Sequence, residues 1–182
     1  MKRAVILFAE GYETVEALLV VDLLRRGGVE VTMASITEDE FVRSSHGVNV
    51  EMDAVLGEVD VLDYDAIILP GGMPGTRYLA AYKPLTDLLE SFYNKGGKVA
   101  AICAAPSIFA QLGFLKGRKA TSYPSFMDKL EGAVTTEEPV AVDGNVTTSR
   151  GLGTAIDFAL SLIGQLEGME KAKEIGESIV YF

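Results

Sequence analysis

Short runs of apolar and β-branched residues alternate along the chain with longer stretches in which apolar positions recur at helical spacing. The runs that predict strands are Ala4–Phe8, Val29–Ala34, Ala66–Leu69 and Lys98–Ile102. They are nearly continuous in apolar residues, as are strands of a parallel sheet that is buried on both faces. The stretches that predict helices are Glu13–Arg26, Leu85–Lys95, Pro106–Leu112 and Thr154–Leu166.

Two segments depart from this alternation. Phe41–Met52 reads as a pair of strands that turns near Gly47, and Val140–Thr148 reads as a hairpin through Asp143-Gly144. No linker is long enough to divide the chain. We therefore expect a single domain over residues 1–182, a three-layer α/β sandwich with a mostly parallel sheet, helices on both faces and a small hairpin element.

Composition narrows the class of function. The 182 residues carry 16 basic and 26 acidic side chains, a net charge of −10, which argues against a nucleic-acid binder. No stretch approaches about 18 uninterrupted apolar residues, and the apolar run after Arg3 ends at Glu10, too early for a signal peptide. We expect a cytoplasmic protein that binds neither nucleic acid nor a membrane.

The chain has one cysteine, Cys103, and one histidine, His46. One cysteine cannot form an internal disulfide, which fits a reducing compartment. The two residues together cannot supply the three or four ligands of a usual zinc site, so we expect no metal. A catalytic Cys–His pair would have to use His46.

Cys103 stands where the strand Lys98–Ile102 must turn into the helix that begins at Pro106. Small residues lie two positions before and after it, Ala101 and Ala105, as a nucleophile on a sharp strand-to-helix turn requires. The N–H of Ala104 and the helix N-terminus are expected to favour the thiolate and lower the pKa of Cys103. The alternative is an inert cysteine in the core.

Leu69-Pro70-Gly71-Gly72 follows another strand that the pattern predicts to be buried. Its glycines would let the backbone approach a ligand and point free N–H groups at a developing oxyanion. Without a reactive neighbour, a plain tight turn explains them better. With Cys103 on the neighbouring strand, an oxyanion-binding loop and a plain tight turn explain these glycines about equally well.

Glu16 lies on the first predicted helix with Leu19, Val20 and Leu23 at helical spacing. A carboxyl on an apolar stripe is desolvated, which raises its pKa and favours the protonated form. Such a carboxyl beside a thiolate would donate a hydrogen bond to it. The alternative is a charge that complements the helix N-terminus, which is also the simpler interpretation of Glu13.

Two other features have simpler explanations. His46 lies beside a predicted turn. It is either a solvated turn histidine or an imidazole at the edge of a site, where it would contact an anionic substrate group and could come from a partner subunit. Thr148–Thr154 suggests a dinucleotide fingerprint, but Ile156 occupies the third glycine position, and no Walker A pattern occurs. We expect no cofactor, and a glycine turn in which Thr154 caps the last helix.

Four segments in order along the chain resemble the ThiJ/PfpI superfamily, and its parkinsonism-associated deglycase branch in particular. They are Glu13–Ala17, Leu69–Gly72, Ala101–Pro106 and Thr148–Thr154. The resemblance implies a flavodoxin-like sandwich of the class I glutamine amidotransferase type, usually a homodimer. It also implies that Cys103 is a nucleophile and redox-sensitive thiol, that Glu16 is its protonated partner, and that Gly72 and Ala104 donate backbone N–H groups.

The chain departs from this superfamily at two positions. The protease-like branch has histidine directly after the cysteine, where this chain has Ala104, so peptidase chemistry is not expected. Several relatives in the deglycase branch have histidine where this chain has Tyr123. Tyr123 could bond near the sulfur, but a phenol with a pKa near 10 is a poor base at neutral pH. Proton transfer then falls to Glu16, His46 or water.

Two functions follow from these residues and from the resemblance. The first is a cofactor-free glyoxalase or deglycase in which Cys103 attacks small 2-oxoaldehydes or releases them from protein or nucleotide adducts. The second is a stress protein, a redox sensor or chaperone, whose Cys103 is oxidised to sulfinic acid with little turnover. A glutamine-amidotransferase-like module is a weaker third reading, because it needs a Cys–His–Glu relay and no histidine follows His46.

Overall fold

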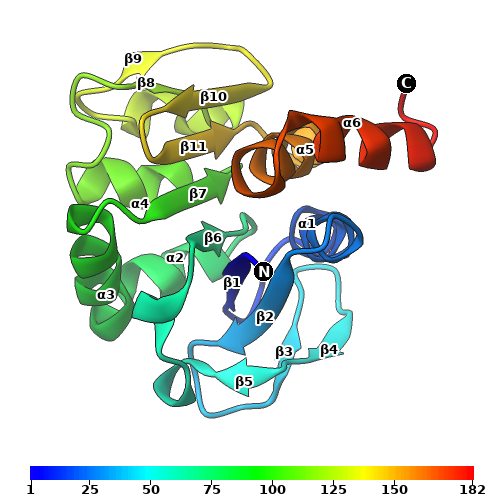
Figure 1. The fold of residues 1–182 in the computed structure, drawn as a ribbon. Helices are drawn as coiled ribbons and strands as arrows, with labels where there is room; N and C mark the ends of the chain where they lie inside the picture. The colour runs from blue at the N-terminus through cyan, green and yellow to red at the C-terminus, as the bar shows by residue number, and fades with distance from the viewer.

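A seven-stranded sheet forms the middle layer of the protein, with helices against both of its faces (Figure 1). The computed structural model describes residues 1–182 in full. In spatial order the strands are β10 (Val140–Asp143), β11 (Val146–Ser149), β7 (Lys98–Ile102), β6 (Ala66–Leu69), β1 (Arg3–Phe8), β2 (Glu30–Ser35) and β5 (Ala54–Val55). Neighbouring strands are parallel except β10 and β11. The expected α/β class is confirmed.

Each face of the sheet buries its own apolar cluster, because side chains alternate along a strand. Ala4, Ile6 and Phe8 of β1 pack on one side, and Val5 and Leu7 pack on the other. The first side is covered by α1 (Thr14–Arg26), α5 (Ala155–Glu167) and α6 (Met169–Ser178); the second is covered by α2 (Gly75–Ala81), α3 (Lys83–Asn94) and α4 (Pro106–Gln111). Because β1, β6 and β7 are parallel neighbours, their carboxyl ends meet at one edge of the sheet.

Smaller elements lie around this frame. β3 (Phe41–Arg43) and β4 (Asn49–Glu51) form an antiparallel hairpin, and β8 (Lys119–Ala120) pairs with β9 (Val134–Thr135). Short 3-10 helices cover Leu56–Glu58, Val61–Asp63, Pro124–Lys129 and Leu152–Thr154. No helix has both the length and the apolar character needed to span a bilayer.

The predicted strands and helices occur within two residues of their expected bounds, and both hairpins are confirmed. Two helices were missed. α2 begins at Gly75 and has only seven residues, and α6 is mostly polar, with Ala172, Ile175 and Gly176 buried. Thr154 is the N-cap residue of α5, as expected, but its hydroxyl makes no capping hydrogen bond to that helix and accepts from the backbone N–H groups of Arg150 and Gly151 instead.

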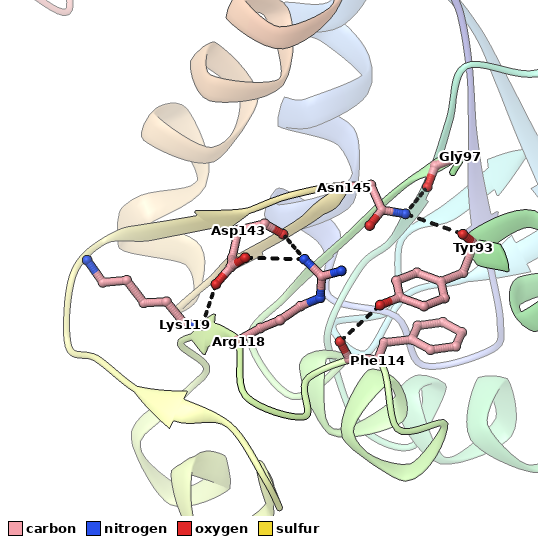
Figure 2. A network of polar contacts seen from close by, with 7 residues as sticks. All are labelled: Tyr93, Gly97, Phe114, Arg118, Lys119, Asp143 and Asn145. Atoms are coloured by element: carbon pink, nitrogen blue, oxygen red, sulfur yellow. Dashed lines mark hydrogen bonds and ion pairs between the residues drawn. The ribbon is translucent and has the colours of Figure 1, made fainter. Parts of the chain in front are cut away.

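A polar network ties the β10–β11 turn to the rest of the sheet (Figure 2). Nη1 of Arg118 donates to the backbone oxygen and to Oδ1 of Asp143 at 3.0 and 3.2 Å, and its guanidinium group lies over the ring of Tyr93. Nδ2 of Asn145 donates to the carbonyl of Gly97 at 2.8 Å. β11 pairs with β7, the strand that leads into Cys103, so this network stabilises the strand next to β7.

Replacing Asn145 with alanine should lower the free energy of unfolding by about 1–2 kcal/mol, because the carbonyl of Gly97 then loses its side-chain donor. Urea denaturation of the wild type and the variant measures the difference. Asn94→Ala, at an exposed position near the end of α3, is the matched control and should change stability by less than about 0.5 kcal/mol. Equal effects of the two substitutions would contradict a structural role for the network.

Candidate active site

Cys103 occupies the turn from β7 into α4, as the sequence predicts, and we call this turn the Cys103 elbow. Its φ of 65° lies in the left-handed region, which a residue other than glycine seldom adopts. Two hydrogen bonds hold the elbow, from the N–H of Cys103 to the carbonyl of Ser149 at 3.0 Å and from the N–H of Tyr123 to the carbonyl of Cys103 at 2.8 Å. The half-buried thiol is thus held in a strained but well-supported position.

Glu16 brings a buried carboxyl group to this thiol. It sits in the first turn of α1, where the Glu13 side chain accepts from the N–H of Glu16 at 2.7 Å and caps the helix. Glu16 is only 2% exposed, and its carboxyl contacts the sulfur of Cys103. The N–H groups of Gly71 and Leu152 face this carboxyl, yet Oε2 has no partner with good hydrogen-bond geometry. This oxygen is therefore free to hold a proton against the sulfur.

The two glycines after β6 allow this close packing. A Cβ atom built on Gly71 would lie 2.5 Å from both the Cβ of Cys103 and Oε2 of Glu16. Gly72 has a φ of 96°, in the left-handed region. Its N–H and that of Ala104 both approach the sulfur. The structure thus brings together Cys103, Glu16 and the two expected backbone donors.

The expected low pKa of the thiol is wrong. Burial is the largest cause, and together with the negative charge of Glu16 and its hydrogen bond to the thiol it raises the pKa of Cys103 to about 12; the N–H groups of Ala104 and Gly72 offset only part of this rise. Burial also raises the pKa of Glu16 from 4.5 to about 7, as expected. At pH 7 the thiol therefore keeps its proton, while the Glu16 carboxyl is about half ionised.

The two candidate residues at the site edge differ in placement. His46 is exposed, and its Nδ1 lies 3.1 Å from the hydroxyl of its neighbour Ser45, so within this chain it behaves as a turn histidine. Tyr123 is bound to the elbow through its backbone, and its ring lies beside Gly151. Its side chain is 48% exposed. Glu16 is thus the titratable side chain that contacts the sulfur.

Two hollows on the surface have different relations to this site. A shallow pocket of about 310 Å³ lies between Tyr123-Pro124 and Arg150–Thr154, next to the elbow. A larger apolar groove of about 580 Å³ runs between β10, α5 and α6. Cys103 lines neither hollow, but Tyr123 and Gly151 of the smaller pocket lie against the Cys103 elbow and Glu16, so we assign the chemistry to that side.

Sequence reasoning missed two contributors to the site. Ser149 binds the elbow through its carbonyl, and Leu152 presents its N–H to Glu16. Ser149 could have been found, because it ends the strand next to β7. Leu152 contributes only its backbone, and no side-chain pattern signals that.

Comparison with known proteins finds similarity over almost the whole chain. The DJ-1/PfpI family model matches residues 2–165. DJ-1 homolog B of Arabidopsis thaliana is 41% identical over 181 residues, which cover 98% of this chain and 41% of that protein. A glutathione-independent glyoxalase of Caenorhabditis elegans is 34% identical over 177 residues, 96% of this chain and 94% of that protein. The chain thus spans less than half of the Arabidopsis relative and almost all of the nematode one.

A solved structure extends the agreement to three dimensions. Oxidized DJ-1 of Toxoplasma gondii has a TM-score of 0.95 and 38% identity, with 99% of this chain and 98% of that chain covered. Cys103, Glu16 and Gly72 all lie inside the range that the family model matches. Fold, sequence and the order of the elements along the chain agree. The chain belongs to the DJ-1/PfpI family.

Proposed function

We propose that the protein is a cofactor-free enzyme that converts small 2-oxoaldehydes, such as methylglyoxal, into 2-hydroxy acids, or releases the same group from protein or nucleotide adducts. The observation that carries this proposal is the buried Glu16 carboxyl, with an unpartnered oxygen, in contact with the Cys103 sulfur. A base with a pKa of about 7 suits proton transfer at neutral pH.

The first step uses Glu16 as a base. As the sulfur attacks the aldehyde carbon, the thiol proton passes to the Glu16 carboxylate and a C–S bond forms. Glu16 then gives this proton to the former carbonyl oxygen, which completes the hemithioacetal and leaves Glu16 as a carboxylate for the next step. The resting thiol thus needs no low pKa, because its proton leaves only as the bond forms. The N–H groups of Gly72 and Ala104 that meet the sulfur would also lie beside the oxygen on the attached carbon.

The second half moves a proton within the adduct. Glu16 carries the proton from the carbon bonded to sulfur to the neighbouring carbonyl carbon, and the hydroxyl proton of the first carbon moves to the oxygen of the second. The first carbon is thereby oxidised to a thioester and the second is reduced to an alcohol. Water then breaks the C–S bond and releases the 2-hydroxy acid, which restores the thiol. Methylglyoxal plus water gives lactate, so atoms and electrons balance. The nematode relative that is named a glutathione-independent glyoxalase supports this reaction class.

A redox-sensing role is the second candidate. The N–H groups of Gly72 and Ala104 at the sulfur would bind the oxygens of a sulfinate, and the Toxoplasma relative was solved in an oxidized form. With a single cysteine in the chain, an internal disulfide cannot resolve the oxidised sulfur. The raised pKa of Cys103 weighs against this role, because the thiolate is the form that peroxide attacks.

Removing the sulfur should abolish turnover. With methylglyoxal as substrate, Cys103→Ala should form lactate at the uncatalysed rate, and Glu16→Gln should be slower than the wild type by about a hundredfold because the base is lost. Asp22→Asn is the matched control on the same helix, since Asp22 is exposed and paired with Arg26. Lactate formation in Cys103→Ala at the wild-type rate would end the proposal.

The reactivity of Cys103 should rise with pH through about 7, because only the ionised Glu16 can accept the thiol proton. The rate of alkylation by iodoacetamide, followed by intact mass between pH 5 and pH 9, measures this. Glu16→Gln should lack the inflection near pH 7, whereas Asp22→Asn should keep it. An unchanged inflection in Glu16→Gln would assign it to another group.

Peroxide separates the two candidate functions. If turnover is the main role, Cys103 should oxidise no faster than an ordinary thiol with dilute hydrogen peroxide at pH 7, because burial raises its pKa to about 12. Intact mass over time, with glutathione as the reference thiol, gives the rates. Rapid and selective formation of the sulfinic acid in the wild type would favour the sensor instead.

A further inference from the structure

Arg150 stands in the wall of the pocket beside the Cys103 elbow. It directly follows Ser149, whose carbonyl holds the N–H of Cys103. Its neighbour Gly151 lies close to Glu16, since a Cβ atom built there would be 3.6 Å from Oε1. Arg150, Gly151 and Tyr123 line the same pocket of about 310 Å³. Arg150 therefore lines the pocket that borders the Cys103 elbow and Glu16.

The guanidinium group of Arg150 is held by neutral groups. Nε donates to the carbonyl of Ser122 at 3.4 Å, and Nη1 donates to the carbonyl of Glu137 at 3.3 Å. Most arginine and lysine side chains in ion pairs, such as Arg26 and Lys83, lie at exposed sites. Arg150, in contrast, is half-buried and forms no ion pair with a carboxylate. Three of its five N–H donors are left free.

An unpaired cation in this position is notable because the protein as a whole carries a charge of −10. Carboxylates are abundant on the surface, yet none neutralises Arg150. The backbone carbonyls fix the plane of the guanidinium without removing its charge, and a planar fork of free N–H groups matches a carboxylate. The pocket size is that of a small-molecule site.

We propose that Arg150 makes this pocket a carboxylate-binding subsite, so that the site prefers electrophiles that carry a carboxylate a few bonds from the reacting carbon. This inference rests on the proposed function for the identity of the substrate as a 2-oxoaldehyde. The preference for anions does not depend on catalytic turnover, and it should appear in any reaction of the Cys103 sulfur. Arg150 acts here as a specificity-determining residue.

Two alkylating agents test the anion preference without any catalysis. Iodoacetate and iodoacetamide differ in charge and form the same type of C–S bond with loss of iodide. The ratio of their rates with Cys103, iodoacetate over iodoacetamide, should fall by about fivefold to tenfold in Arg150→Gln. Arg150→Lys, which keeps the charge, should retain most of the ratio. An unchanged ratio in Arg150→Gln overturns the proposal.

A substrate pair tests the specificity. Arg150→Gln should lower kcat/KM for 4,5-dioxovalerate, a 2-oxoaldehyde with a terminal carboxylate, by about tenfold, and should leave its uncharged methyl ester within about twofold. Equal losses for acid and ester would show a general disturbance of the loop and contradict a carboxylate subsite. If the wild type turns over neither aldehyde, the proposed function fails, and the alkylation ratio still decides whether Arg150 binds the anion.

Discussion

The contact between the Cys103 sulfur and the buried carboxyl of Glu16 is the interaction on which the rest of the site depends. Burial is the largest cause of the raised pKa of both groups, about 12 for Cys103 and about 7 for Glu16. At pH 7 the thiol is therefore protonated and Glu16 is about half ionised. In the reaction that we propose, transfer of the thiol proton to Glu16 accompanies the attack of sulfur, so the nucleophile stays protonated until a substrate is bound.

The fold supplies this contact from four separate segments. β7 ends in the strained elbow, α1 carries Glu16, the glycines after β6 leave space for the carboxyl, and β11 holds the N–H of Cys103 through Ser149. Parallel strands bring their carboxyl ends to one edge, so segments far apart in sequence meet there. The cost of placing Cys103 at a φ of 65° is offset by the hydrogen bonds on either side of it.

Much of this arrangement is readable from the sequence, because it depends on strong local patterns. Buried strands are continuous in apolar residues, and small residues flank Cys103, so the sheet, the elbow and the role of the glycines could be predicted. The apolar stripe around Glu16 indicated a raised pKa. The pKa of Cys103 was predicted in the wrong direction, because burial depends on tertiary packing and outweighs two N–H donors. α6 and the carbonyl partners of Arg150 depend on packing in the same way.

The most direct test of Glu16 as the proton carrier is the titration of Glu16 itself, followed by the NMR shift of its carboxyl carbon in protein labelled with 13C at glutamate and assigned with Glu16→Gln. A midpoint at about pH 7 is predicted, well above the ordinary value of 4.5. A midpoint near 4.5 would mean that Glu16 is ionised throughout the neutral range. It would contradict the account of Glu16 as the proton carrier for Cys103.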